Sequence, residues 1–199
     1  MSEQRNKIGH LTVRLGPMCA GKTSHACQEA STLSVLGLRV AYINHNIDND
    51  RTTLGGCPGK FHCHNPSNIF LDSNVETLIS STLSSLNLEL YEAIVIDESQ
   101  FFDDLVETVN KLVNDGKIVQ VYGLAATFDR KKFGHTIELI PNADVFEQMT
   151  AKCVVCLKDK DLGFQPASFT MKTIDGAEVI VAGGLEKYLA VCRKHHHIN

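Results

Sequence analysis

The spacing of apolar positions predicts four main strands in the first three quarters of the chain. In each of them β-branched and other apolar residues alternate with polar ones or follow one another, as they do in half-buried or fully buried strands. The run YEAIVI is apolar at all but its second position, which is typical of a central strand covered on both faces. We expect strands over 10–15, 38–44, 91–96 and 117–124, with a shorter one at 69–71.

Between these strands the apolar residues recur at helical spacing. Residues 24–36 contain no Gly or Pro and are followed by Gly37, a typical helix end. A second amphipathic run would turn its apolar residues inward and end at Gly116. Asp72 or Ser73 could cap a third helix. We expect helices over 24–36, about 74–86 and 102–114, and a short one over 142–150; inward positions of the 102–114 helix are Leu105, Val106, Val109, Leu112 and Val113.

Strands that alternate with helices in this way predict an α/β fold with a parallel sheet. Residues 44–68 are polar and irregular and predict a long loop. Beyond Pro141 the pattern changes to short strands, turns and Cys or His residues, with no strong helix. We therefore expect an α/β domain over 8–148 and a small second domain over 149–199.

Composition narrows the class of protein. The chain has 199 residues, 43% of them hydrophobic and 21% charged, which suits one core of ordinary size with a small appended unit. The net charge of −4 gives no reason to expect nucleic acid as a partner. No apolar run has the ~20 residues that a membrane span needs, and the N-terminal residues lack the apolar core of a signal peptide. We expect a soluble, cytoplasmic protein that binds no membrane.

The segment between the first strand and the first helix fits G-x-x-x-x-G-K-[ST], the phosphate-binding P-loop. Its glycines let backbone N–H groups turn toward phosphate oxygens, and the N-terminus of the following helix adds partial positive charge. Lys22 would reach the β- and γ-phosphates, and the Thr23 hydroxyl would bind Mg²⁺. The predicted nucleotide-binding residues here are Gly16, Pro17, Met18, Cys19, Ala20, Gly21, Lys22 and Thr23.

Two acidic residues follow the central strand. Ligands of parallel sheets bind at the carboxyl ends of strands, so Gly16, Asp97 and Leu124 should line one cleft. Asp97 could hold Mg²⁺ beside Thr23, or it could be a turn residue. Glu98 could be the general base of a kinase, could activate water in an ATPase, or could cap the next helix.

The chain has seven cysteines, an odd number, and their spacing along the sequence is irregular. Both features argue against a disulfide framework. Cys153 and Cys156 form a C-x2-C knuckle, and Cys192 and His195 a C-x2-H knuckle; four such ligands suit a structural Zn²⁺. His196 or His197 could replace His195, and a redox-active C-x2-C pair is the less favoured alternative. A second set, Cys57, His62, Cys63 and His64, fits no common zinc pattern and is better explained as part of a surface loop.

Four segments together resemble the type II thymidine kinase family, the small cytosolic and viral enzymes. GPMCAGK is similar to GPMFSGK, DESQFF to DEGQFF, TFDRKKFG to TFQRKPFG, and VAGGLEKYLAVC to VIGGxDxYxSVC. The segments occur in the family's order and cover about residues 10–195.

The resemblance implies a P-loop α/β domain with a zinc-binding lasso domain, and a deoxynucleoside kinase. Such an enzyme would transfer the ATP γ-phosphate to the 5′-hydroxyl of thymidine or deoxyuridine, giving dTMP and ADP. Glu98 would be the catalytic base, and Lys22, Thr23 and Asp97 would hold ATP·Mg²⁺. Further nucleotide contacts would come from Asn49, Asp50, Arg51 and Gln100. The nucleoside site would contain Met18, Phe101, Leu124, Phe128, Thr170, Val179, Ile180, Val181, Ala182, Gly183 and Tyr188. The resemblance also implies a homotetramer and feedback inhibition by dTTP.

The chain departs from the family pattern near the acceptor site. Ser99 replaces a Gly, which matters if the backbone needs φ > 0 there, and Ala125-Ala126 replaces Asp-Gly. Two rivals therefore remain: a P-loop nucleotide-binding or regulatory module without acceptor chemistry, and an ATPase. Without the resemblance, Phe101, Phe128 and Tyr188 would be read as packing residues.

Overall fold

A six-stranded parallel sheet forms the centre of the computed structural model, which describes residues 8–47, 74–159, 163–173 and 188–196. The strand order is β3-β2-β4-β5-β1-β6, and every neighbouring pair runs parallel. The strands are β1 (His10–Leu15), β2 (Val40–His45), β3 (Val75–Ser80), β4 (Ala93–Ile96), β5 (Ile118–Gly123) and β6 (Val145–Gln148). The predicted α/β class with a parallel sheet is confirmed.

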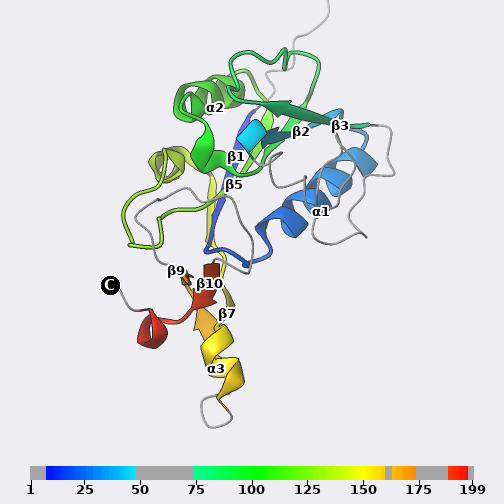
Figure 1. Cartoon of the computed structure of the whole chain (residues 1–199). Helices are drawn as coiled ribbons and strands as arrows, with labels where there is room; N and C mark the ends of the chain where they lie inside the picture. Colours follow the sequence, from blue (N-terminus) through cyan, green and yellow to red (C-terminus); the bar gives the residue numbers. More distant parts are fainter. Residues whose placement is uncertain (1–7, 48–73, 160–162, 174–187, 197–199) are drawn as a thin grey trace, which may run out of the picture.

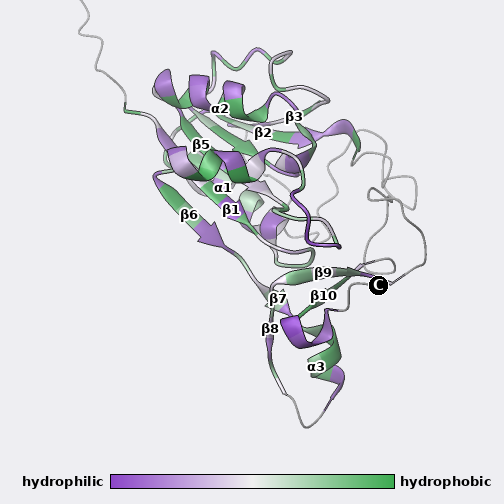
Figure 2. Cartoon of the chain, turned by 90° about the vertical axis from the view of Figure 1, so that its left-hand side faces the viewer, coloured by the Kyte–Doolittle hydropathy of each residue, from purple (hydrophilic) through white to green (hydrophobic). Residues whose placement is uncertain are grey.

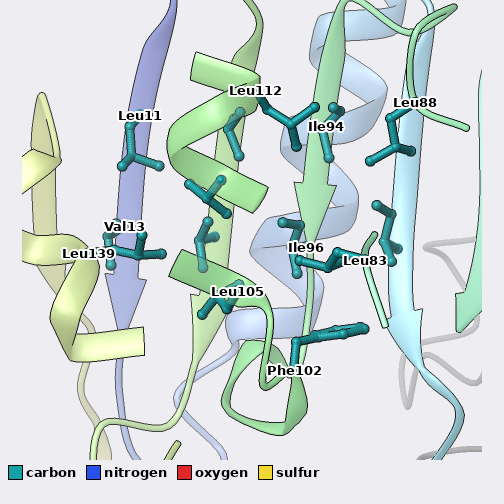
Figure 3. Packing of buried hydrophobic residues seen from close by; sticks show 14 of the residues in the cluster. Leu11, Val13, Leu83, Leu88, Ile94, Ile96, Phe102, Leu105, Leu112 and Leu139 are labelled. Carbon is teal, nitrogen blue, oxygen red and sulfur yellow. The ribbon is translucent and has the colours of Figure 1, made fainter. Parts of the chain in front are cut away.

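Helices cover both faces of the sheet (Figure 1). α1 (Lys22–Val35) packs through Ala26, Cys27 and Ala30 on Tyr42, Val95 and Tyr122. α2 (Leu105–Asn114) covers the opposite face, where Leu105, Val109 and Leu112 are buried and Val106 and Val113 lie against the core, as predicted. Figure 3 shows the buried side chains at this face, where Leu105, Phe102 and Leu139 belong to the same hydrophobic cluster as Val13, Ile94 and Ile96 of the sheet.

Short 3-10 helices complete the main body. η3 (Ser99–Phe101) leads from β4 toward α2, and η4 (Thr136–Asn142) lies between β5 and β6. The strands thus keep their predicted positions within a few residues, while the helix expected to begin at residue 102 begins at Leu105 because η3 and a turn come first.

Two predicted helices are strands in the structure. The region expected to be helical over about 74–86 contains β3, which pairs with β2 in the register Val40↔Val75 to His45↔Ser80 and is followed by turns. The region 142–150 contains β6, which pairs with β1. In both places an open sheet edge offers ladder hydrogen bonds, and β-branched residues such as Val75, Thr77 and Val145 suit an extended chain. The strand expected at 69–71 lies outside the described residues.

The C-terminal part forms a small unit at the end of the sheet that carries the P-loop (Figure 1). Its described residues form two short antiparallel ladders, one short α-helix and one 3-10 helix; the strands and the α-helix are labelled in Figure 2. β7 (Ala151–Lys152) pairs with β8 (Pro166–Ala167), β9 (Phe169–Lys172) pairs with β10 (Tyr188–Val191), α3 spans Val154–Lys158 and η5 spans Arg193–His195. Its buried residues, among them Cys153, Cys156 and Val191, make a core separate from that of the sheet. No helix in the described part of the chain is long and apolar enough to cross a membrane.

Candidate active site

Three strand ends bring the predicted site together. Because β4, β5 and β1 are neighbours in the sheet, Asp97, Leu124 and Gly16, which directly follow them, lie side by side at one edge. The three stretches that were expected to meet at the carboxyl ends of their strands are therefore neighbours. This arrangement also places the P-loop beside the two carboxylates.

The P-loop turns back on itself between β1 and α1. Cys19 and Gly21 have left-handed backbones, with φ of 63° and 78°, and such alternation turns N–H groups toward a common centre. The Lys22 ammonium is buried and donates to the carbonyl oxygens of Gly16 and Pro17, at 3.2 and 2.8 Å. Burial lowers the pKa of Lys22, and the nearby carboxylates of Glu98 and Asp97 oppose that shift. A phosphate group would provide this ammonium with a charged partner.

Asp97 is almost completely buried at the end of β4. Its carboxylate accepts hydrogen bonds from the Tyr42 hydroxyl on β2 at 2.9 Å and from the backbone N–H of Glu98 at 2.9 Å. Burial and the neighbouring Glu98 raise the pKa of Asp97 to about 6, although hydrogen bonds from Thr23 and Tyr42 act in the opposite direction. The contact with Thr23 places this carboxylate beside the P-loop hydroxyl, as a shared Mg²⁺ site requires.

Glu98, the next residue after Asp97, makes different contacts. Its backbone is left-handed, with φ of 50°. Its carboxylate accepts a hydrogen bond from Gln100 Nε2 at 2.6 Å, and Gln100 Oε1 accepts the backbone N–H of Leu124 at 2.9 Å. Gln100 therefore holds Glu98 against the end of β5. The two adjacent carboxylates thus differ in environment: that of Asp97 is buried in the core, and that of Glu98 is only partly buried.

Ser99 fits this corner without backbone strain. The left-handed residue is Glu98, and Ser99 is not among the residues with positive φ. The Ser99 hydroxyl is fully buried, lies 2.9 Å from that of Thr136, and fills space beside Gly123, where a Cβ would come within 2.2 Å of it. The doubt that this departure raised about the backbone is therefore removed.

Several of the residues predicted to hold the nucleoside belong to the described part of the chain. Phe101 makes an edge-to-face contact with Phe133, with ring centroids 5.5 Å apart. Thr170 on β9 accepts a hydrogen bond from the backbone N–H of Met18 at 3.0 Å, so the small C-terminal unit touches the P-loop directly. Phe128 is partly buried, and Tyr188 on β10 is 7% exposed.

A cavity of about 250 Å³ lies between the base of the P-loop, the segment after β5, and β9. Pro17, Ala125, Ala126 and Thr170 are among its lining residues. The substitutions at 125 and 126 thus border open space next to the site. Asn49, Asp50 and Arg51, and likewise Val179, Ile180, Val181, Ala182 and Gly183, lie outside the described residues, as do Cys57, His62, Cys63 and His64.

Four potential metal ligands meet in the C-terminal unit. The ligand atoms of Cys153, Cys156, Cys192 and His195 all lie within 4.8 Å of one another. His195 Nδ1 is 3.6, 3.3 and 3.4 Å from the three sulfurs, and Cys156 Sγ is 3.7 Å from Cys192 Sγ. Tetrahedral Zn²⁺ with Zn–S of about 2.3 Å and Zn–N of about 2.0 Å requires separations of about 3.5–3.8 Å.

The two cysteines of the C-x2-C knuckle have thiol pKa values that are shifted in opposite directions. Despite the opposing effect of burial, N–H groups and His195 lower the pKa of Cys153 to about 6. Burial and the neighbouring sulfurs of Cys153 and Cys192 raise the pKa of Cys156 to about 12. A Zn²⁺ ion would stabilise both thiolates, so the donor set fits zinc. Of the three successive histidines, His195 lies with the sulfurs, whereas His196 Nε2 contacts the carbonyl oxygens of Phe128 and Thr170; His197 lies outside the described residues.

Sequence reasoning missed two residues that organise the site. Tyr42 lies in the middle of the apolar strand β2, and the need of a buried hydroxyl for a partner was the only available signal. His196 was considered only as a substitute zinc ligand. It is 8% exposed, and its Nε2 lies 2.8 Å from the carbonyl oxygen of Phe128.

Comparison with known proteins agrees with this geometry. The family described as thymidine kinase matches residues 9–196. The chain belongs to the thymidine kinase family. Its relatives include the thymidine kinases of vaccinia virus (strain Tian Tan) and monkeypox virus, each 31% identical, and that of fowlpox virus (strain NVSL), 32% identical. Each alignment covers 94% of this chain and 96% of the relative.

Full-length homology of this kind, together with the family match, gives the chain the activity of a thymidine kinase. It is an ATP-dependent phosphotransferase, homologous to the poxvirus type II enzymes over almost its whole length. The rival readings as a binding module or an ATPase are set aside. The cysteine and histidine cluster agrees with the zinc-binding domain that the resemblance implied.

Proposed function

We propose that Glu98 is the general base that takes the proton from the 5′-hydroxyl of thymidine as the hydroxyl attacks the γ-phosphorus of ATP. Its position carries the proposal: the carboxylate is at the end of β4, held at 2.6 Å by Gln100 and close enough to Lys22 to influence its pKa. A base must be oriented toward the acceptor and remain reachable. Asp97, sealed by Tyr42, is unsuited to that role.

The phosphate side of the reaction is assigned to the P-loop. Backbone N–H groups of residues 16–23 would cradle the phosphates, and Lys22 would exchange the carbonyls of Gly16 and Pro17 for phosphate oxygens. Thr23 and Asp97 would hold Mg²⁺, which neutralises developing phosphate charge when bound. Asn49, Asp50 and Arg51 are proposed from the family resemblance to contact the nucleotide, with Gln100 supporting the corner between the substrates.

Thymidine and deoxyuridine are the proposed acceptors. Met18, Phe101, Leu124, Phe128, Thr170 and Tyr188 would surround the base and sugar, with residues 179–183 closing over them. The hydrogen bond between Thr170 and Met18 supports this because it brings the C-terminal unit to the P-loop. The Cys153, Cys156, Cys192 and His195 cluster would hold structural Zn²⁺, and the two domains would divide at residues 148 and 149.

Three further expectations come from the family resemblance: inhibition by dTTP, a cytoplasmic location and a homotetramer. The edge strand β6 supports self-association. Every residue of β6 is exposed, including Val145 at 43% and Phe146 at 47%. An open edge with apolar side chains is a surface on which another strand can pair.

The Glu98→Gln substitution tests the central assignment. It keeps the shape of the side chain and its contact with Gln100 but removes the base, so we expect kcat to fall by about 10²–10⁴-fold. The dissociation constant of thymidine, measured by calorimetry, should change by less than about threefold, because binding does not need the proton transfer.

The matched control is Glu107→Gln, at an exposed position in the first turn of α2. It should leave kcat unchanged. If Glu98→Gln kept its turnover, Glu98 would not be the base. Running both variants with thymidine and with deoxyuridine also tests the proposed acceptor range.

A further inference from the structure

His196 joins three parts of the molecule that are far apart in the sequence. Its ring nitrogen Nε2 lies 2.8 Å from the carbonyl oxygen of Phe128 and 3.2 Å from that of Thr170. Phe128 belongs to the segment after β5, whereas Thr170 lies on β9. His196 itself directly follows His195, a member of the cysteine and histidine cluster.

The contacts define the direction of the hydrogen bonds. Both neighbours of Nε2 are carbonyl oxygens, which can only accept, so Nε2 carries the proton and donates. Nδ1, the other ring nitrogen, is buried without a partner among the described residues. Because Nδ1 has no hydrogen bond there, the ring is kept in place by the hydrogen bonds of Nε2 and by packing.

Packing fixes the ring from one side. The rings of His196 and Phe169 have centroids 5.3 Å apart. Phe169 in turn lies under two guanidinium groups, with Arg193 at 4.9 Å and Arg130 at 5.7 Å from its centroid. His196 is 8% exposed, so its donor is largely protected from competition by water.

The chain of contacts ends in the active site. Thr170 presents its carbonyl to His196 and its hydroxyl to the backbone N–H of Met18 in the P-loop, at 3.0 Å. A single imidazole therefore ties the Phe128 segment to β9 at the residue where β9 meets the P-loop. Any shift of this imidazole would move Phe128 and Thr170 relative to Met18.

We infer that His196 is a positioning residue for the nucleoside: its Nε2–H group sets the distance between Phe128 and Thr170 and thereby the affinity for thymidine. The inference rests on the proposed placement of Phe128, Thr170 and Met18 around the nucleoside. The ATP half of the site depends instead on the P-loop, Asp97 and the central sheet. Loss of the donor should therefore affect the two substrates unequally.

Steady-state kinetics on two variants of the full-length, zinc-loaded enzyme test this role. His196→Phe keeps an aromatic ring against Phe169 but has no donor, so KM for thymidine should rise about tenfold. Both kcat and KM for ATP should stay within about twofold. His196→Gln can place an amide N–H near the position of Nε2 and should return KM for thymidine to within about threefold of the parent value.

The controls separate positioning from general damage. Lys194→Ala changes an exposed residue in the same turn and should alter none of the constants. Zinc content, measured by atomic emission, should stay the same in all variants. If His196→Phe misfolds, the pair His196→Gln and His196→Asn decides instead, because the shorter Asn amide cannot reach both carbonyls and should raise KM for thymidine.

The outcomes distinguish this inference from the function on which it rests. An unchanged KM for thymidine in Phe128→Ala would show that the proposed pocket is wrong. If KM for thymidine rose in Phe128→Ala but stayed unchanged in His196→Phe, the proposed pocket would stand and only the role of His196 would be overturned. Equal changes for both substrates, loss of zinc, or a Gln variant no better than Phe would also overturn it.

Discussion

At Asp97, burial and the neighbouring Glu98 raise the carboxyl pKa to about 6, from an ordinary value of 3.8. The folded protein therefore binds a proton at Asp97 more tightly than the unfolded chain does. The stability that this provides is complete below about pH 4 and is lost as the pH rises through about 6. A cation at the site would reverse the preference, because it requires the carboxylate.

Two measurements follow for Asp97. With wild-type enzyme, the affinity for Mg²⁺·ATP should increase as the pH rises through about 6. In the absence of Mg²⁺ and nucleotide, Asp97→Asn should raise the free energy of unfolding at pH 8 by about 1–3 kcal/mol while abolishing kinase activity. The amide can keep the contacts with Tyr42 and the Glu98 N–H. Denaturant titrations at pH 8 and pH 5 measure the free energy of unfolding of both proteins. The advantage of Asp97→Asn over wild type should be smaller at pH 5 than at pH 8. A variant that is less stable than wild type at pH 8 would contradict this prediction.

Ser99 and Tyr42 show where sequence reasoning about single residues reaches its limit. The P-loop and Asp97-Glu98 could be found because their chemistry is local and ordered along the chain. By contrast, whether Ser99 would be strained depended on the conformation of its neighbour Glu98 and on the space beside Gly123. The partner of Tyr42 is 55 positions away in sequence, so only the register of β2 beside β4 brings it to Asp97.

At the scale of elements, the central strands were predictable and the sheet edges were not. β1, β2, β4 and β5 carry continuous or alternating apolar patterns, because both of their faces are covered. β3 and β6 lie at the two edges, and the residues of β6 are all exposed, so no apolar pattern distinguishes them from helix. Their strand character comes from pairing with β2 and β1, which is a tertiary effect.

A polar network also ties elements together on the α1 face of the sheet. Arg14 on β1 donates to Gln120 Oε1 at 2.6 Å and to the Tyr122 hydroxyl at 2.9 Å on β5, and to Glu147 on β6 at 2.9 Å. The Tyr122 hydroxyl also lies 3.0 Å from His25 Nδ1 in α1. Because Tyr122 is buried, its hydroxyl has no water to replace these partners.

Tyr122→Phe should therefore destabilise the protein by about 1–2 kcal/mol, because Arg14 and His25 lose a partner. The matched control is Tyr91→Phe, which removes a hydroxyl that contacts Glu76 at 2.5 Å in a more exposed setting. There water can take over, and the cost should stay below about 0.5 kcal/mol. Urea denaturation measures both; equal losses would show that burial of the Tyr122 network is unimportant.

For the whole molecule, a zinc ion at the proposed site would link folding of the C-terminal unit to substrate binding. The cluster draws α3 and η5 together, and β9 and β10 lie between them and the P-loop. The large sheet has a hydrophobic core of its own, separate from that of the C-terminal unit.

Removal of zinc with a chelator should therefore abolish thymidine binding while ATP binding, followed by calorimetry, falls less than about threefold. Cys156→Ser should have the same effect and lose zinc. Cys27→Ala, which changes a buried cysteine of α1 outside the cluster, should keep zinc and both affinities. Thymidine binding that survived complete loss of zinc would contradict the link.

The proposed tetramer would use the open edge of the sheet. Within the described residues β6 pairs with β1 alone, and Val145 and Phe146 are 43% and 47% exposed. A charged side chain at such an edge discourages strand pairing, because the charge would have to lose water in the interface. Phe146→Lys should therefore convert the proposed tetramer into a smaller species in sedimentation velocity.

Val35→Lys is the control, since Val35 is 80% exposed at the end of α1, away from this edge. It introduces the same charge at another exposed apolar position, so a general effect of charge on solubility would appear in both variants. A stable interface needs about 1,000 Å² or more of buried surface, which a four-residue strand supplies only together with its neighbours. A tetramer that persists in Phe146→Lys would exclude β6 from the interface, and a monomeric parent protein would exclude the tetramer itself.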